Sequence, residues 1–152
     1  MQYKENTITE MEILYKPSSH VLTRPNITSS AEANKVIRAL FNQNSIACQE
    51  EFIILYLNQG NKPTGFYKMG KGGISSTVAD IRLIMGAALK SLSTSLIISH
   101  NHPSGNLTPS KADLNLTKQI KEACKIFDIQ LLDHLIISPL EEYYSFSDDG
   151  VL

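Results

Sequence analysis

The sequence predicts a single domain of the α/β or α+β class, in which helices pack against a central sheet. The chain has 152 residues, of which 42% are apolar, and this suits one domain with one core. Short apolar segments typical of strands are mixed along the chain with segments in which apolar residues recur at helical spacing. An eight-stranded TIM barrel is excluded, because it needs roughly 250 residues.

Residues 1–28 are expected to form an N-terminal arm and connector, followed by the domain itself at residues 29–152. The connector carries two prolines and many Ser and Thr residues, which is typical of irregular structure. Ser29 or Ser30 then begins a helix that we expect to run to about Phe41.

The middle of the chain predicts a hairpin followed by a helix. Residues 51–57 are rich in strand formers, residues 58–62 form a turn, and residues 64–69 can return as the second strand. A helix is expected from about residue 78 to Leu92, because its apolar residues recur at helical spacing.

The C-terminal part predicts a strand, a helix and two further strands. Residues 95–99 form a short apolar strand that we expect to be buried on both faces. A helix should run from Ser110 to about Phe127, followed by strands at residues 129–137 and 143–146. The inward-facing stripe of this helix is expected to consist of Leu116, Ile120, Ala123 and Phe127.

Charge gives no general argument for nucleic-acid binding. The net charge is −1 and the calculated pI is about 6.4. The nearest approach to a basic patch is a helical face with Lys118, Lys121 and Lys125, which we expect to be solvated.

Cysteine use and hydropathy predict a reduced, cytoplasmic protein. Cys48 and Cys124 are far apart and form neither a disulfide framework nor a Cys-x-x-Cys pair. The N-terminus has no apolar run of signal-peptide length. No stretch of 18 consecutive apolar residues is present, so no membrane span is expected.

Two histidines at the end of the strand 95–99 are the first sign of a functional site. If the strand continues to His102, alternation places the side chains of His100 and His102 on the same side. Their Cα atoms would then lie about 6–7 Å apart. Two imidazole nitrogens can converge from there on one ion, at the zinc–nitrogen distance of about 2.0–2.1 Å.

Asp113 supplies a third candidate ligand. It lies three residues before Leu116 on the buried face of the helix, where a carboxylate is costly unless it is paired or bound to a metal. The preceding loop is short, so the helix must begin near the end of the histidine strand. Three protein ligands plus water are typical of catalytic zinc sites. Ser110 and Asp113 also fit a purely structural helix cap with an acidic partner at the third helical position.

The string HNHPSGNLTPSKAD at residues 100–113 resembles the JAMM (MPN+) metalloprotease motif. Together with LLDHLIIS at residues 131–138, it is similar to the RadC-like branch of that superfamily. The resemblance covers about residues 30–152. It implies a three-layer αβα sandwich of the JAB/MPN type, which is related to the cytidine-deaminase-like architecture.

The resemblance also implies roles for individual residues. His100, His102 and Asp113 match the zinc ligands, and Ser110 matches the serine that supports the oxyanion. The family uses an upstream glutamate as general acid and base, for which Glu50 and Glu51 are the candidates. In relatives this glutamate lies two residues before an aromatic residue, which is Phe52 here, and this favours Glu50. Alternation along the strand alone does not say which of the two glutamates faces the metal.

The resemblance implies two possible functions of different class. The first is a zinc hydrolase that cleaves a peptide or isopeptide bond in a peptide or protein substrate. The alternative is a RadC-like non-catalytic binding module associated with DNA repair or mobile-element DNA processing. The intact set of candidate residues favours the hydrolase, and residues 1–28 lack the helix-hairpin-helix pattern that full-length RadC-like proteins carry. Exposed strand edges could support a homodimer.

His134, preceded by Asp133 on a predicted strand, is a further candidate. It could support a metal ligand from outside or contact substrate. The alternative is an ordinary hydrogen-bonded strand histidine, which is the reading we favour from the sequence.

Overall fold

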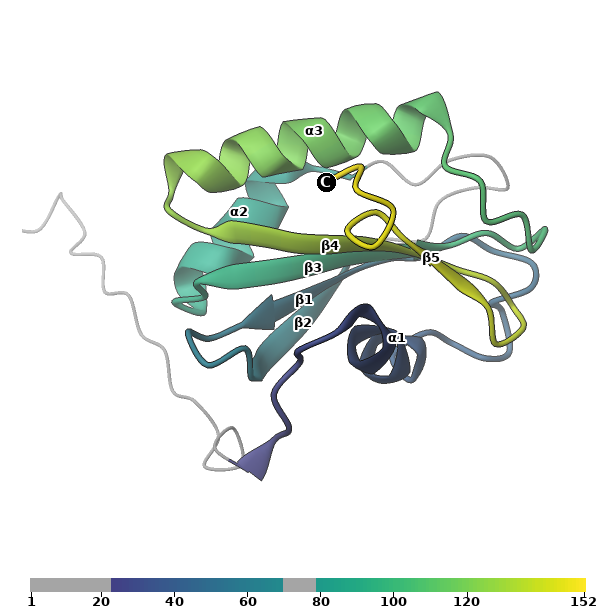
Figure 1. Ribbon diagram of the computed structural model, residues 1–152, viewed down its shortest axis with the longest axis horizontal. Coiled ribbons are helices and arrows are strands. Elements are labelled where there is room, and N and C mark those ends of the chain that lie inside the picture. The colour runs from purple at the N-terminus through teal and green to yellow at the C-terminus, as the bar shows by residue number, and fades with distance from the viewer. Residues whose placement is uncertain (1–22, 70–78) are drawn as a thin grey trace, which may run out of the picture.

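The protein is described by a computed structural model in which residues 23–69 and 79–152 are placed (Figure 1). Most of the expected arm, residues 1–22, and the expected helix start at Val78 lie outside these ranges.

A five-stranded mixed sheet forms the middle layer, with the strand order β2-β1-β3-β4-β5 (Figure 1). Strands β3 and β4 pair in parallel, whereas the other three neighbouring pairs are antiparallel. The strands are β1 (Phe52–Leu57), β2 (Pro63–Met69), β3 (Ser95–Asn101), β4 (Gln130–Ile137) and β5 (Tyr143–Ser145). Every residue of β1 and of β3 is buried, because both faces of the central strands are covered by helices.

The three helices within the described ranges divide between the two faces of the sheet. They are α1 (Ser30–Arg38), α2 (Ile81–Lys90) and α3 (Lys111–Ile126). Helix α1 packs its buried Ala33 and Ile37 on one face, while α2 and α3 cover the other (Figure 1). The predicted three-layer αβα sandwich is therefore confirmed.

Alternation along the strands sends residues into two separate cores. On β1, Phe52, Ile54 and Tyr56 face α2 and α3, whereas Ile53 and Leu55 face α1. This division matters for the site, because His100 of β3 lies opposite Phe52 and its ring stacks on that side of the sheet, the side that α2 and α3 cover.

Two predictions about helix ends were wrong. Leu92 is 65% exposed, because α2 ends at Lys90 and Leu92 adopts a left-handed conformation with φ of 50°. Phe127 is the C-cap of α3 and is 45% exposed. The buried residues of α3 are Thr117, Ile120 and Cys124. Within the described part of the chain, no helix combines the length and the apolar content that a bilayer crossing requires.

Candidate metal centre

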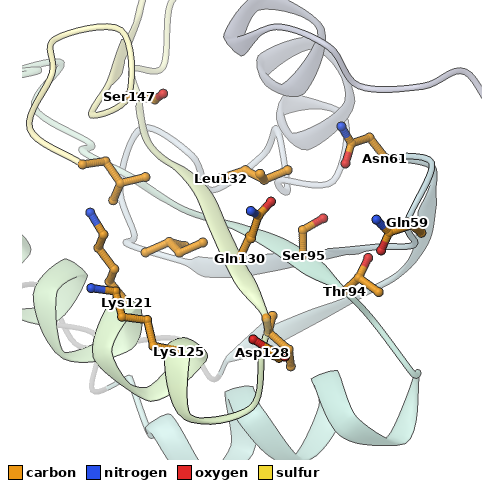
Figure 2. A pocket seen from close by; sticks show the side chains of 13 residues that line it. Gln59, Asn61, Thr94, Ser95, Lys121, Lys125, Asp128, Gln130, Leu132 and Ser147 are labelled. Atoms are coloured by element: carbon orange, nitrogen blue, oxygen red, sulfur yellow. The ribbon is translucent and has the colours of Figure 1, made fainter.

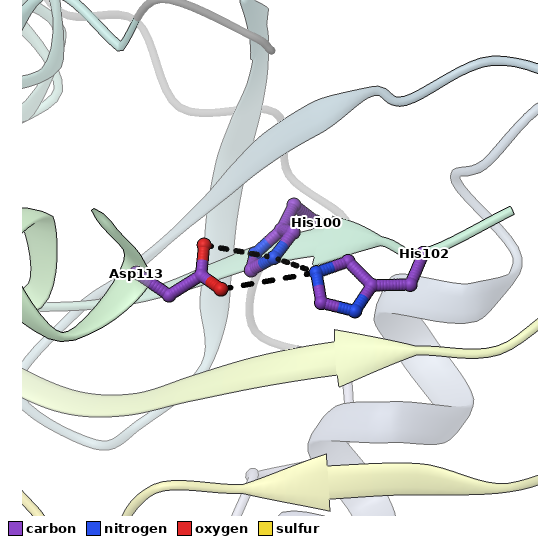
Figure 3. A group of neighbouring side chains, drawn as sticks. All are labelled: His100, His102 and Asp113. Atoms are coloured by element: carbon purple, nitrogen blue, oxygen red, sulfur yellow. Dashed lines mark hydrogen bonds and ion pairs between the residues drawn. The ribbon is translucent and has the colours of Figure 1, made fainter. Parts of the chain in front are cut away.

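His100, His102 and Asp113 come together where β3 ends and α3 begins (Figure 3). The Nε2 atoms of His100 and His102 are 2.9 Å apart. His100 Nε2 lies 3.3 Å from Asp113 Oδ1, and His102 Nε2 lies 3.8 Å from Asp113 Oδ2. One possible ligand atom from each residue thus lies within 4.8 Å of the others, which is close enough for all three to bind one ion.

The loop between β3 and α3 brings the helix back to the strand end. The backbone N–H of His102 donates to the carbonyl of Ile137 at 2.9 Å, which extends the pairing with β4 beyond Asn101. Gly105 then closes a turn by donating to the carbonyl of His102 at 2.9 Å, with φ of 78°. Because few residues other than glycine adopt this left-handed conformation, the turn depends on Gly105.

Asp113 is held by the cap of α3. Its Oδ2 accepts from the backbone N–H of Ser110 at 2.7 Å, and Ser110 Oγ accepts from the backbone N–H of Asp113 at 3.1 Å. This reciprocal capping box is the structural alternative considered for the two residues. It is compatible with metal binding, because it orients the carboxylate while Oδ1 faces His100. The Ser110 hydroxyl accepts in the cap, so its hydrogen remains available for donation.

The ring of His102 is oriented by a backbone carbonyl. Its Nδ1 lies 2.5 Å from the carbonyl oxygen of Asn106, which can only accept. Nδ1 therefore carries the proton, and the lone pair of Nε2 points toward His100 and Asp113.

His100 is buried and neutral. Only 6% of its surface is exposed, and its ring stacks on Phe52 with the ring centres 6.2 Å apart. Burial lowers the pKa of His100 to about 4, although the nearby Asp113 carboxylate acts in the opposite direction. A neutral imidazole at physiological pH is the form that binds a metal ion.

Glu50 and Glu51 lie in different surroundings. Glu50 lines a hollow beside His102 and Ser110, and burial raises the pKa of its carboxyl group. The carboxylate of Glu51 is buried, accepts from Ser45 Oγ at 3.2 Å, and lies 3.7 Å from Lys68 Nζ. The placement favours Glu50 as the glutamate of the site, and its chemical role stays a prediction.

Asn101 connects the histidine strand to the segment that carries Glu50. Its side-chain amide donates to the carbonyls of Ile46 and Gln49 at 2.8 and 2.9 Å, and its Oδ1 accepts from the backbone N–H of Glu51 at 2.7 Å. All of these bonds lie on the α1 side of the sheet. Asn101 therefore holds the Glu50 segment in place from the face opposite to the ligands.

His134 contacts the candidate ligand His100, and the sequence alone did not identify this contact. It is fully buried, and its Nε2 lies 2.8 Å from His100 Nδ1. His134 is thus a hydrogen-bonded strand histidine whose partner is His100. Asp133 has a separate role: its carboxylate accepts from Ser145 Oγ and from the backbone N–H groups of His134 and Ser147.

A β-bulge turns His134 toward the site. The register between β3 and β4 shifts beyond Leu96, so that Leu132 and Asp133 both face the α1 side. His134 then faces the side of α3, as Leu131 does. Strict alternation from Leu131 would have placed His134 on the opposite face, and bulges beside functional sites commonly redirect a side chain in this way.

A second hollow lies at the other end of β3, beside Ser95 and the preceding Thr94 (Figure 2). Lys121 and Lys125 of α3 line it together with Asp128. Two lysines of the predicted solvated face therefore border this hollow, and none of the three candidate ligands belongs to it.

The fold and the site together define a JAB/MPN-type αβα domain with a group of two histidines and one aspartate able to hold a metal. A family model for the RadC-like JAB domain matches residues 27–151. The chain belongs to the RadC-like JAB domain family, as the resemblance in its sequence predicted.

Curated relatives support this assignment. The chain is 43% identical over 131 residues to a UPF0758 protein of Flavobacterium johnsoniae, covering 86% of this chain and 56% of the relative. It is 39% identical over 136 residues to a UPF0758 protein of Porphyromonas gingivalis, covering 90% of this chain and 59% of the relative. A UPF0758 protein of Streptococcus sanguinis is 37% identical over 131 residues, covering 86% and 56%. The chain thus spans little more than half the length of these relatives.

Proposed function

We propose that this chain is a zinc-dependent hydrolase of the JAMM type that cleaves a peptide or isopeptide bond. The observation that carries the proposal is the placement of Glu50 and Ser110 in one hollow with His102, next to the three converging ligand atoms. An acid–base group, a hydrogen-bond donor and a metal-binding group at one place are the parts that amide hydrolysis requires.

The donor set fits zinc. Two neutral imidazole nitrogens and one carboxylate oxygen are common ligands of catalytic zinc, which leaves one position for water or substrate. Zinc bound by His100, His102 and Asp113 would polarise a carbonyl group and lower the pKa of water towards 7.

Glu50 is proposed as the group that moves the proton. It would take a proton from the attacking water and pass it to the leaving amine. The pKa of Glu50 is raised by its burial, and this brings the carboxyl group closer to the range in which it can both accept and donate at neutral pH.

Ser110 is proposed as the donor to the developing oxyanion. Its oxygen already accepts from the backbone of Asp113, and this contact positions the hydroxyl while leaving its hydrogen to donate into the hollow. Loss of one such donor typically costs about 10²–10³ in rate.

The proposed setting is the reducing cytoplasm, because Cys48 and Cys124 are both free thiols. A peptide or protein is the proposed substrate, as the resemblance to JAMM metalloproteases implies, and the net charge of −1 gives no electrostatic support for direct nucleic-acid binding.

The experiment compares Glu50→Gln with Glu51→Gln as its matched control. Zinc content is measured by mass spectrometry, and cleavage is measured on libraries of fluorogenic peptides and isopeptide-linked peptides. We expect about one zinc per chain in the wild type and in both variants, with cleavage lost only in Glu50→Gln.

Three results would count against parts of this proposal. A Glu50→Gln variant that is as active as the wild type would remove Glu50 from the mechanism. A folded wild type that takes up no zinc when zinc is offered would remove the hydrolase. A zinc-loaded wild type that cleaves no member of either library would favour the non-catalytic RadC-like module.

A further inference from the structure

A buried chain of hydrogen bonds joins two of the candidate ligands behind the site. Thr117 Oγ1 lies 2.6 Å from the backbone carbonyl of Asp113 and 2.6 Å from His134 Nδ1. His134 Nε2 lies 2.8 Å from His100 Nδ1. Thr117 and His134 are both buried, so solvent does not compete for these bonds.

The donor and the acceptor of every hydrogen bond in this series follow from its first bond, the one to the carbonyl of Asp113. The carbonyl of Asp113 can only accept, so the single hydroxyl hydrogen of Thr117 is used there. Thr117 Oγ1 must then accept from His134, whose Nδ1 carries the proton. His134 Nε2 is consequently the acceptor, and His100 Nδ1 is the donor.

The result is that His100 presents the lone pair of Nε2 to the site. His102 presents its Nε2 lone pair as well, because Asn106 accepts from its Nδ1. The two Nε2 atoms face each other at 2.9 Å, with the Asp113 carboxylate beside them. Three acceptors directed at one place repel one another, and a bound cation relieves that repulsion.

This series of hydrogen bonds also links secondary-structure elements that are distant in sequence. Thr117 belongs to α3, His134 to β4 and His100 to β3. The bulge in β4 is what directs His134 between the other two. A buried histidine that uses both ring nitrogens in this way satisfies its own polar atoms, and it transmits the orientation of the α3 backbone to the ring of His100.

We propose that Thr117 and His134 are positioning residues of the metal centre, which fix His100 in the Nδ1–H tautomer before any metal binds. This proposal rests on metal binding by His100, His102 and Asp113, and it does not require that the protein be a hydrolase. Neither residue touches the metal or the substrate; both act through His100.

The first test removes the hydroxyl that sets the direction. Thr117→Val keeps the shape of the side chain but leaves His134 Nδ1 without an acceptor. The dissociation constant for zinc, measured by competition with a chelator, should rise about 10–100-fold, as expected for an outer partner of a metal ligand. Thr117→Ser restores the hydroxyl and should bind zinc within a few-fold of the wild type.

Thr64→Val is the matched control. Thr64 Oγ1 also donates to a backbone carbonyl, that of Tyr56 at 3.1 Å, but on β2 rather than beside the ligands. Its zinc affinity should equal that of the wild type. If Thr117→Val and Thr64→Val bind zinc equally tightly, the proposal is wrong.

The second test reads the tautomers directly in the metal-free wild type. Long-range ¹H–¹⁵N correlation spectra should show His100 and His134 with the proton on Nδ1. A proton on Nε2 of His100 would overturn the proposal without any variant. Because neither measurement uses catalysis, a wild type that binds zinc with the expected tautomers and cleaves nothing would count against the hydrolase alone.

Discussion

Asp113→Asn separates the two roles of one side chain. Asp113 Oδ2 caps α3 by accepting from the backbone of Ser110 at 2.7 Å, while Oδ1 faces His100. An asparagine keeps an oxygen that can accept from Ser110, so the helix cap should survive. It loses the negative charge and the second oxygen, so the metal ligand should be lost.

The size of the effect can be stated as a shift of melting temperature. Loss of an outer partner costs about 10–100-fold in metal affinity, so loss of the Asp113 ligand should exceed about 100-fold. With zinc at about 100 times the wild-type dissociation constant, zinc stabilises the wild type by about 2.7 kcal/mol and the variant by at most about 0.4 kcal/mol. For a domain of this size the melting temperature should rise by about 5–10 °C in the wild type and by less than about 2 °C in Asp113→Asn.

The assay is scanning calorimetry with and without zinc, and Ser110→Ala is its control. Ser110→Ala removes one half of the cap, which should lower the melting temperature in the absence of zinc by an amount equivalent to about 1 kcal/mol. The zinc-dependent rise should remain in that variant. If Asp113→Asn shows the same rise as the wild type, Asp113 is a capping residue and not a ligand.

Three further predictions follow from burial and backbone conformation. In metal-free protein, His100 should lower the free energy of unfolding by about 3 kcal/mol as the pH drops from 6.5 to about 4. Burial lowers the pKa of His100 in the folded protein, so the unfolded chain takes up the proton first. Urea titrations at several pH values should show a smaller fall in His100→Gln. An aromatic disulfide reagent should modify Cys48 rapidly but Cys124 only in denaturant, since Cys48 is exposed and burial raises the pKa of Cys124 to about 11; two fast thiols in the native protein would contradict this. Gly105→Ala should lower the free energy of unfolding by about 1 kcal/mol, because φ is 78° there, whereas Gly86→Ala on an open helical surface should raise it by about 0.5–1 kcal/mol; denaturant midpoints of both variants check the opposite signs.

The candidate ligands could be predicted because they are specified by local sequence. His100 and His102 share a strand face through a period of two, and Asp113 shares a helix face with Leu116 through a spacing of three. The short loop between them allows few arrangements, and Gly105 provides the turn that it needs. The mixture of helices and strands was predictable for a similar reason, since the apolar segments have the lengths and periods of their elements, whereas the three-layer αβα arrangement followed from the resemblance to the JAB/MPN type.

The contact between His134 and His100 could not be predicted, because it depends on pairing between distant segments. The bulge that directs it exists only once β4 pairs with β3 in a particular register. The Glu50 segment is similar, since contacts with Ser45 and Lys68 occupy Glu51 and no local pattern specifies them. The expected helix was extended to Leu92, and Phe127 was placed on the inward-facing stripe, because helical periodicity does not show where a helix ends.

Asn101 restricts insertions and deletions near the site. The segment from His100 to His102 presents alternate residues to opposite sides of the sheet: the imidazoles to one side and the Asn101 amide, which holds the Glu50 segment, to the other. A deletion or insertion of one residue within β3 would exchange the two sides and separate the ligands from the glutamate in a single step. The hairpin turn at residues 58–62 is attached to the same sheet, yet it should accept added residues with little effect, because no residue there contacts the metal centre.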